Sequence, residues 1–349
     1  MKYKLPSIIY IVLCLLTACV KAPEARTLTV LTHDSYSVSN ELITNFEAEN
    51  QVDITFVKSG DTGAALNRVI LLQANNTPAG DVFYGVDNTF LSRALEQDIF
   101  EPYNSKSLEN IPAAFQLDSQ KRALPVDYGD VCINYDKAWF AERGLAVPSS
   151  LEDLLKPEYA GLLVVQSPAT SSPGLAFMLA TIAHFGEDGY LDYWQQLVEN
   201  DVVIVNDWET AYYTNFSGSS GRGGQPMVVS YASSPPAELI YAETPLLEAP
   251  TASIIGEGTC FRQVEFVGIL KGTKNRDLAE KFIDFMLSKE YQEDLPLQMF
   301  VFPVNPEAIL PEAFIQAAQV LESPAALDPQ RISEMREAWI DAWLERVLK

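Results

Sequence analysis

The sequence has few of the residues on which most catalytic and metal sites depend. Its 349 residues include only two histidines, His33 and His184, and four cysteines. It contains no His-Glu-x-x-His, Gly-x-Ser-x-Gly or Cys-x-x-Cys motif, so the patterns typical of zinc hydrolases, serine hydrolases and thiol oxidoreductases are missing. His33 beside Asp34 is weak evidence for acid–base catalysis. We therefore expect a protein that is not an enzyme and that uses no cofactor or metal ion.

Basic residues are also scarce, with 24 lysines and arginines against 47 aspartates and glutamates. Removing residues 1–18, which hold two lysines and no acidic residue, changes the net charge from −23 to about −25. A surface with this charge repels nucleic acids and anionic membranes and favours cationic ligands. The same charge is also typical of proteins that only need to stay soluble. We expect no nucleic-acid partner.

Long apolar runs are missing after the first residues. Lys2 and Lys4 precede an apolar run, residues 8–16, that is short for a membrane span and is followed by Thr17-Ala18-Cys19. This pattern predicts a bacterial lipoprotein signal, residues 1–18, and a lipidated tether, residues 19–26, that begins at Cys19. A plain transmembrane anchor is the alternative. The remaining chain would then be extracytoplasmic and lipid-anchored, in a periplasm or on the outer face of the cell membrane.

The cysteines reduce to one possible pair. Cys14 leaves with the signal and Cys19 carries the lipid, so Cys132 and Cys260 are the thiols that remain. Outside the cytoplasm such thiols can form a disulfide. Two separate buried cysteines are the alternative, because sequence alone does not give their distance.

Strand and helix patterns alternate after the tether. The predicted strands are residues 27–31, 52–57 and 82–86, and the helices that follow them are residues 39–49, 64–74 and 87–97. This order predicts an α/β fold with a mainly parallel sheet and helices on both faces.

Two strand-like runs, residues 126–135 and 264–270, lack this alternation and are predicted to cross between two lobes. Two crossing strands are typical of a hinge. Residues 277–294 predict one amphipathic helix that rejoins the first lobe. The expected units are lobe 1, residues 27–128 and 264–302, lobe 2, residues 129–263, and C-terminal helices, residues 303–349, packed on lobe 2 or across the lobes.

Three polar, turn-forming stretches occupy the middle of the chain: residues 167–174, 207–212 and 230–235. Each follows an apolar strand-like run and precedes a helix-like run. Ligands bind at such junctions in α/β sheets, because free N–H groups and small hydroxyls converge there. Trp208 and several tyrosines add flat faces for an aromatic or cationic ligand. Ordinary surface turns are the alternative for any single stretch, but the three together favour a binding cleft.

With these features the chain resembles the extracytoplasmic solute-binding proteins of ABC importers, and within them the thiamine-binding branch. The resemblance covers nearly all of the mature chain. The segments that carry it include Leu28-Thr29-Val30, Gly85-Val86-Asp87-Asn88, Asp127-Tyr128-Gly129, Thr170 to Leu175, Trp208 with Ala211-Tyr212, Ser230 to Pro235, and Arg336 to Trp343. It implies a two-lobed periplasmic-binding-protein fold, type II-like, with a two-strand hinge and a ligand cleft between the lobes.

The resemblance also implies a function and a site. The function is capture of thiamine, or of its phosphates, by a monomer that delivers the ligand to ABC permease subunits. Trp208 would stack on a ring, carboxylates would face the thiazolium cation, and hydroxyls could hold a phosphate. The implied ligand-binding residues are Asp34, Asp61, Thr62, Ser171, Ser172, Trp208, Tyr212, Tyr231, Ala232, Ser233, Ser234 and Phe300.

Three departures bear on the solute. His33 and Ala237 stand where the family pattern has tyrosines, and Phe300 stands where it has a tryptophan, so thiamine binding is expected to weaken or specificity to move. Ferric iron is an alternative solute, because related iron-binding proteins use adjacent tyrosines such as Tyr212-Tyr213. A polyamine or another small cation is a further alternative. A purely structural or adhesive lipoprotein would need neither cleft hydroxyls nor a hinge.

Overall fold

The computed structural model describes residues 26–219 and 223–348. The predicted signal peptide and Cys19 lie outside the described residues. Across the described ranges, none of the helices combines the length and the apolar character that crossing a membrane requires.

One mixed sheet runs through the molecule in the order β2-β1-β3-β10-β5-β8-β6-β7, with β4, β9 and β11 paired at its sides. The strands are β1 (Arg26–Thr32), β2 (Val52–Lys58), β3 (Val82–Asp87), β4 (Phe100–Glu101), β5 (Leu124–Asp136), β6 (Leu163–Gln166), β7 (Val203–Val205), β8 (Met227–Tyr231), β9 (Thr251–Ile254), β10 (Phe261–Leu270) and β11 (Phe302–Pro303). Strands β1, β2 and β3 are parallel, as are β6, β7 and β8. Two parallel halves are thus present, as the βα alternation predicts.

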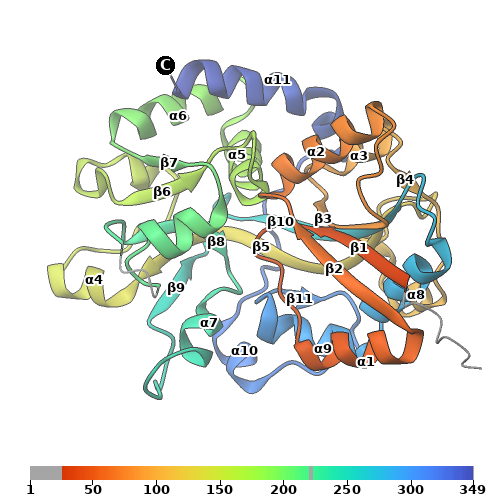
Figure 1. Cartoon of the computed structure of the whole chain (residues 1–349). Coiled ribbons are helices and arrows are strands. Elements are labelled where there is room, and N and C mark those ends of the chain that lie inside the picture. The colour runs from red at the N-terminus through yellow and green to blue at the C-terminus, as the bar shows by residue number, and fades with distance from the viewer. Residues whose placement is uncertain (1–25, 220–222, 349) are drawn as a thin grey trace, which may run out of the picture.

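The long strands β5 and β10 join the two halves. They are antiparallel to each other, while β10 also pairs with β3 and β5 also pairs with β8. Figure 1 shows them crossing the middle of the molecule, between β1–β3 on one side and β6–β8 on the other. These are the strands that the sequence predicts to cross between lobes. The sheet is therefore mixed, and the prediction of a mainly parallel sheet is wrong, because β5 and β10 pair antiparallel with each other and with all of their other neighbours.

Helices cover both faces of the sheet, and β3 is buried along its whole length. A strand covered on both faces carries no polar alternation, which fits the apolar run at this position. The α-helices are α1 (Asn40–Asn50), α2 (Thr62–Ala74), α3 (Leu91–Glu96), α4 (Lys137–Arg143), α5 (Ser172–Phe185), α6 (Tyr190–Glu199), α7 (Pro235–Ile240), α8 (Arg276–Met286), α9 (Lys289–Gln298), α10 (Glu312–Ala317) and α11 (Pro329–Val347). Short 3₁₀ helices are η1 (Lys106–Asn110), η2 (Ala113–Phe115), η3 (Glu152–Leu155) and η4 (Pro157–Tyr159), and η5 (Thr210–Asn215) is π-helical.

Two helix predictions need correction. The helix predicted at residues 87–97 is shorter, because Asp87 still belongs to β3 and α3 begins at Leu91. Residues 277–294, predicted as a single amphipathic helix, belong to two helices, α8 and α9. Ser288 has extended backbone and its hydroxyl accepts a hydrogen bond from the Tyr291 N–H at 3.4 Å. A serine in this position caps a new helix, so the chain stops α8 and starts α9 although the apolar pattern continues.

Helix α11 contacts elements on both sides of the molecule. Its Trp343 ring packs edge-on against Trp194 of α6, with centroids 5.2 Å apart. Its buried Arg336 donates to the Thr89 carbonyl oxygen at 3.3 Å and to the Ser92 hydroxyl of α3 at 3.0 Å. Figure 1 shows α11 running along the top from α6 toward α2 and α3. The tryptophans of this helix are packing residues of the core.

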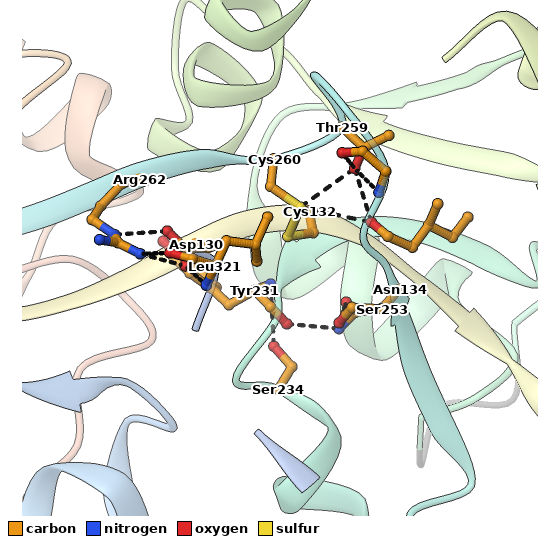
Figure 2. Close-up of a disulfide and its surroundings, with 12 residues drawn as sticks. Asp130, Cys132, Asn134, Tyr231, Ser234, Ser253, Thr259, Cys260, Arg262 and Leu321 are labelled. Carbon is orange, nitrogen blue, oxygen red and sulfur yellow. Dashed lines mark hydrogen bonds and ion pairs between the residues drawn. A yellow bond between two sulfur atoms is a disulfide. The ribbon is translucent and has the colours of Figure 1, made fainter. Parts of the chain in front are cut away.

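A disulfide joins the two crossing strands. Cys132 lies on β5, and Cys260 immediately precedes Phe261, the first residue of β10, which is opposite Val131. Figure 2 shows the bridge beside an ion pair in which the Arg262 guanidinium contacts both Asp130 carboxylate oxygens, at 2.8 and 2.9 Å. The disulfide and this ion pair fix β5 and β10 together where the two halves meet.

Candidate functional site

A cavity of about 250 Å³ lies between the two halves of the molecule. The lining residues come from the segment after β1, the start of α2, the middle of β10 and the end of α9, and from α5, η5, the end of β8 and α7. Eight of the twelve sequence-predicted ligand-binding residues line it: Asp61, Thr62, Ser172, Trp208, Tyr212, Tyr231, Ser234 and Phe300. Its volume and its mixture of aromatic, hydroxyl and carboxyl groups suit a small organic ligand.

Four of the predicted residues do not line the cavity. Asp34 acts indirectly. Its carboxylate accepts a hydrogen bond from the Gly60 N–H at 2.8 Å and so stabilises the turn that precedes Asp61. Ser171 is fully buried and adjoins the Asp61 carboxyl. Ala232 and Ser233 are also fully buried, in the turn that follows β8. Within that turn, Ser234 is the serine that reaches the cavity.

The first wall is aromatic. Trp208 follows β7 and its indole stacks on the Tyr212 ring, with centroids 4.9 Å apart and planes 19° apart. Tyr213 meets the indole edge-on at 5.5 Å. The Trp208 indole N–H donates to the Ser230 hydroxyl at 2.9 Å. Because Tyr212 supports one indole face and Ser230 fixes its edge, the indole is held in place where it borders the cavity.

A second aromatic pair borders the cavity elsewhere. The rings of Tyr241, at the end of α7, and Phe300, after α9, meet edge-on with centroids 5.7 Å apart. The Tyr241 hydroxyl donates to the Leu297 carbonyl oxygen at 3.2 Å. Phe300 has a left-handed backbone, φ 54°, a conformation unusual for a bulky residue and one that is found at ligand sites.

Carboxyl groups gather at the floor of the cavity. Asp61 precedes α2, where its carboxylate accepts the Trp208 backbone N–H at 3.1 Å. Glu265 lies in the middle of β10 and is 7% exposed. Burial raises the pKa of Asp61 to about 6 and that of Glu265 to about 7. Removal from water disfavours the charged form of each group, so both carboxyls titrate close to neutral pH.

His33 adjoins Glu265, and burial favours its neutral form. Its Nδ1 lies 2.9 Å from the Ser35 hydroxyl, and its Nε2 lies 3.6 Å from Glu265 Oε1. Burial is the main influence on this imidazole and lowers its pKa. A neutral imidazole leaves the negative charge of the floor uncompensated.

The hydroxyl groups of the site are mostly engaged. Ser172 donates to the buried Asp87 carboxylate, and Thr62 donates to the Gly85 carbonyl oxygen at 2.8 Å. The hydroxyls of Ser230 and Ser234 lie 2.9 Å apart. The described residues that line the cavity include no lysine or arginine. The cavity lining therefore lacks the cations, and these hydroxyls lack the free donors, with which proteins usually hold a phosphate.

The adjacent tyrosines considered for iron are not arranged for it. The Tyr212 hydroxyl donates to Glu238 Oε1 at 3.1 Å. Burial and Glu238 raise the pKa of Tyr212 well above its usual value and also raise that of Tyr213. Ferric iron binds phenolates, so these environments oppose the form that the metal needs. Among the described residues, no group of three or more histidine, cysteine, aspartate or glutamate side chains could hold a metal ion.

Sequence reasoning missed several lining residues, of which Glu265 is the most informative. Its signal was present, because a single glutamate interrupts the apolar run Val264-Glu265-Phe266-Val267. A charged residue inside a buried strand is rare without a partner or a function. The other lining residues that were not assigned to the site are Ser35, Ser37, Pro173, Glu209, Tyr213, Tyr241, Gln298, Met299 and Val301, while His33 and Ala237 entered as departures from the family pattern.

Comparisons with known proteins fit this geometry. A family model described as bacterial extracellular solute-binding protein matches residues 77–320. The chain is 30% identical over 333 residues, 93% of each chain, to a thiamine-binding periplasmic protein of Brucella suis. A solved structure of a periplasmic thiamin binding protein aligns with a TM-score of 0.80 at 25% identity, covering 92% of this chain and 96% of the other. These likenesses confirm the expected fold and the resemblance to the thiamine-binding branch.

The same fold occurs with other ligands. A ferric binding protein from Campylobacter jejuni aligns with a TM-score of 0.72 at 21% identity, covering 91% of this chain and 99% of the other. Because a fold can carry many different sites, the choice of solute depends on the residues in the cleft.

Proposed function

The chain belongs to the bacterial extracellular solute-binding protein family, and we propose that it captures thiamine outside the cytoplasmic membrane and delivers it to an ABC permease. The observation that carries the choice of thiamine is the stack of Trp208 on Tyr212 beside the Asp61 carboxylate. An aminopyrimidine ring needs a flat apolar face with hydrogen-bonding groups at its edge. A thiazolium ring needs a negative charge and π faces.

Unphosphorylated thiamine is the form that the cleft favours. Its floor carries the carboxyls of Asp61 and Glu265, and its described lining holds no lysine or arginine. The Ser172 hydroxyl, a candidate phosphate donor, is engaged with Asp87. A phosphate group would bring more negative charge to a site without a counter-charge, so we expect thiamine phosphates to bind more weakly.

The two lobes are proposed to comprise residues 27–128 with 264–302, and residues 129–263. At the cleft, three hydrogen bonds cross this boundary in addition to the one from the Tyr241 hydroxyl to the Leu297 carbonyl oxygen. They link the Trp208 N–H to Asp61, the Gly63 N–H to the Thr170 carbonyl oxygen, and the Ser172 hydroxyl to Asp87. The conformation is therefore one in which the lobes touch beside the cavity, as capture of a small ligand by hinge closure requires.

Anchoring by lipid is part of the proposal. We propose that Cys19 becomes the lipidated N-terminus and that the binding domain works as a monomer at the membrane surface. The sequence signal at residues 16–19 supports this proposal. A lipid anchor would keep the protein close to its permease without taking part in ligand binding.

Equilibrium dialysis with radiolabelled thiamine tests the solute. The purified full chain in detergent should bind one thiamine per protein, and unlabelled thiamine should compete best. Thiamine phosphates should compete less well, and ferric citrate or spermidine should not compete. Tight binding of ferric citrate or spermidine, with no retention of thiamine, would contradict thiamine as the solute and indicate iron or a polyamine instead.

A further inference from the structure

Glu265 occupies an unusual position for a charged residue. It lies within β10 between apolar neighbours, and its side chain is 10% exposed. The exposed part borders the ligand cavity. Burying a carboxyl in a strand is unfavourable unless another group compensates. The groups in contact with Glu265 therefore determine how far the cost of burying its carboxyl is offset.

A second carboxyl, Asp127 on β5, lies behind Glu265 and is fully buried. The Tyr84 hydroxyl is placed between them, 2.5 Å from Asp127 Oδ2 and 3.0 Å from Glu265 Oε2. Asp127 and Glu265 are directly opposite each other in the antiparallel pairing of β5 and β10. Tyr84 has one hydroxyl proton and can donate it to one acceptor at a time. The remaining contact needs a further proton, which one of the carboxyls must hold.

Exposure decides which carboxyl holds this proton. Burial and the neighbouring Glu265 raise the pKa of Asp127 well above its usual value. Glu265 touches the cavity, and its pKa is about 7. As the pH rises, Asp127 therefore stays protonated and donates to the Tyr84 oxygen, and the Tyr84 hydroxyl donates to Glu265, which loses its own proton. The pair behaves as one acid whose charge appears on the cavity side.

The groups that face Glu265 do not neutralise it. They come from every element packed around it: His33 after β1, Asp61 before α2, Tyr84 and Asp87 on β3, Asp127 on β5, and Tyr231 on β8. His33 is kept neutral by burial. Lys58 acts on His33, but its ammonium group donates to the Asp34 carbonyl oxygen at 2.5 Å. Across the described residues, no lysine or arginine forms an ion pair with these carboxyls.

We propose that Glu265 selects a cationic ligand for the cleft and releases a proton when the cation binds. The inference rests on the proposed function, because the thiazolium ring of thiamine is the cation considered. Its nitrogen is quaternary, so its charge does not depend on pH. A cation beside Glu265 stabilises the carboxylate over the carboxylic acid. The proton leaves the Glu265 carboxyl for the solvent, and the charge of the cleft is then balanced by the ligand.

The direction of the pH effect follows. Above pH 7 Glu265 is already ionised, and thiamine binds without displacing a proton. Below pH 7 each binding event must release the proton, so affinity should fall about tenfold for each pH unit. Asp61, whose pKa is about 6, should steepen the fall below pH 6. The range from pH 6.5 to 8 therefore reports on Glu265.

Calorimetric titration of the full chain in detergent with thiamine tests the proposal. The titration is run from pH 5.5 to 8.5 in two buffers of different ionisation enthalpy, which counts the protons released. The parent should release somewhat more than one proton at pH 6, where Asp61 contributes beside Glu265, and almost none at pH 8. Glu265→Gln has the same shape without the charge and should lose at least tenfold in affinity at pH 8, together with the slope between pH 6.5 and 8. Glu257→Gln, which changes an exposed glutamate, should match the parent.

A second variant and a second readout complete the test. Asp127→Asn can donate a hydrogen bond at every pH, as protonated Asp127 does, so it should leave the midpoint of the affinity profile close to that of the parent. Binding of thiamine by the parent without pH dependence, or an unchanged profile in Glu265→Gln, would overturn the proposal. Failure of the parent to bind thiamine at any pH would instead contradict the proposed solute. In that case ¹³C NMR of the ligand-free protein tests the titration of Glu265 by itself. A carboxyl that titrates near pH 7 must be present in the parent and missing in Glu265→Gln.

Discussion

The backbone N–H of Trp208 donates a hydrogen bond of 3.1 Å to the carboxylate of Asp61. Asp61 precedes α2, and Trp208 follows β7, so the bond joins the two halves of the molecule beside the cavity. The Gly63 N–H makes a parallel link to the Thr170 carbonyl oxygen at 3.1 Å. The carboxylate thus faces the ligand space and also holds the aromatic wall close to the floor. Ligand binding and lobe closure share this residue.

Replacing Asp61 should weaken both functions. In Asp61→Ala the Trp208 N–H loses its acceptor and the cavity loses one carboxylate. A hydrogen bond to a charged group contributes about 1.5–3 kcal/mol, so thiamine affinity should fall roughly 10- to 100-fold. Small-angle scattering should also show a larger radius of gyration than in the parent. Asp53→Ala, which removes an exposed aspartate on β2, is the control and should change neither property. Unchanged affinity in Asp61→Ala would argue against this link.

The buried Glu265 should make the protein less stable at higher pH. Its pKa rises from 4.5 in the unfolded chain to about 7 in the folded one. Between these values the unfolded state releases the proton while the folded state keeps it. Stability therefore falls as the pH rises from about 4.5 to 7, by about 3 kcal/mol for this group. Urea unfolding at pH 5 and pH 8 should show a smaller pH difference in Glu265→Gln than in the parent. An equal difference in both proteins would contradict the assignment.

The disulfide between Cys132 and Cys260 should stabilise the junction of β5 and β10. The two cysteines are 128 positions apart in the sequence. A cross-link over such a distance restricts the conformations of the unfolded chain. The double variant Cys132→Ala/Cys260→Ala should lose about 2–5 kcal/mol of unfolding free energy. Adding a reductant should lower the melting temperature of the parent and leave that of the double variant unchanged. Two free thiols in the exported protein, found by mass spectrometry, would rule out the bridge.

Cys19→Ser should abolish lipid attachment and leave the precursor unprocessed. The prediction depends on the Leu16-Thr17-Ala18-Cys19 sequence, in which the cysteine is the acceptor of the lipid. Metabolic labelling with a radioactive fatty acid measures it. Cys14→Ser is the matched control, because it changes a cysteine inside the apolar run, and it should be labelled like the parent. Label that persists in Cys19→Ser would remove the lipoprotein assignment.

The fold could be predicted largely from local patterns. Apolar strands followed by amphipathic helices predict the two halves, and the unbroken run of residues 126–135 corresponds to the crossing strand β5. The sequence did not reveal that α8 and α9 separate at Ser288, because the apolar pattern continues across the break. A capping side chain overrides periodicity at that point.

The candidate site was predictable where the signal lies in consecutive residues. Trp208 and Ser172 stand at strand-to-helix junctions, and both line the cavity. The turn after β8 shows the limit, because only backbone geometry decides that Ser234 reaches the cavity while Ser233 is buried. The contacts of the Tyr84 hydroxyl with Asp127 and Glu265 join three strands distant in sequence. No local pattern contains that contact.

The most direct test of the account is a calorimetric titration of the parent and Trp208→Ala with thiamine. Truncating a buried aromatic anchor typically costs about 2–4 kcal/mol, or roughly 30- to 1000-fold in affinity. The variant should keep a melting temperature close to that of the parent and lose most of its affinity, while Trp139→Ala, which removes a tryptophan of α4 outside the cavity, should bind like the parent. Undiminished thiamine affinity in folded Trp208→Ala would contradict the proposed site, and a parent that binds no thiamine would contradict the proposed solute.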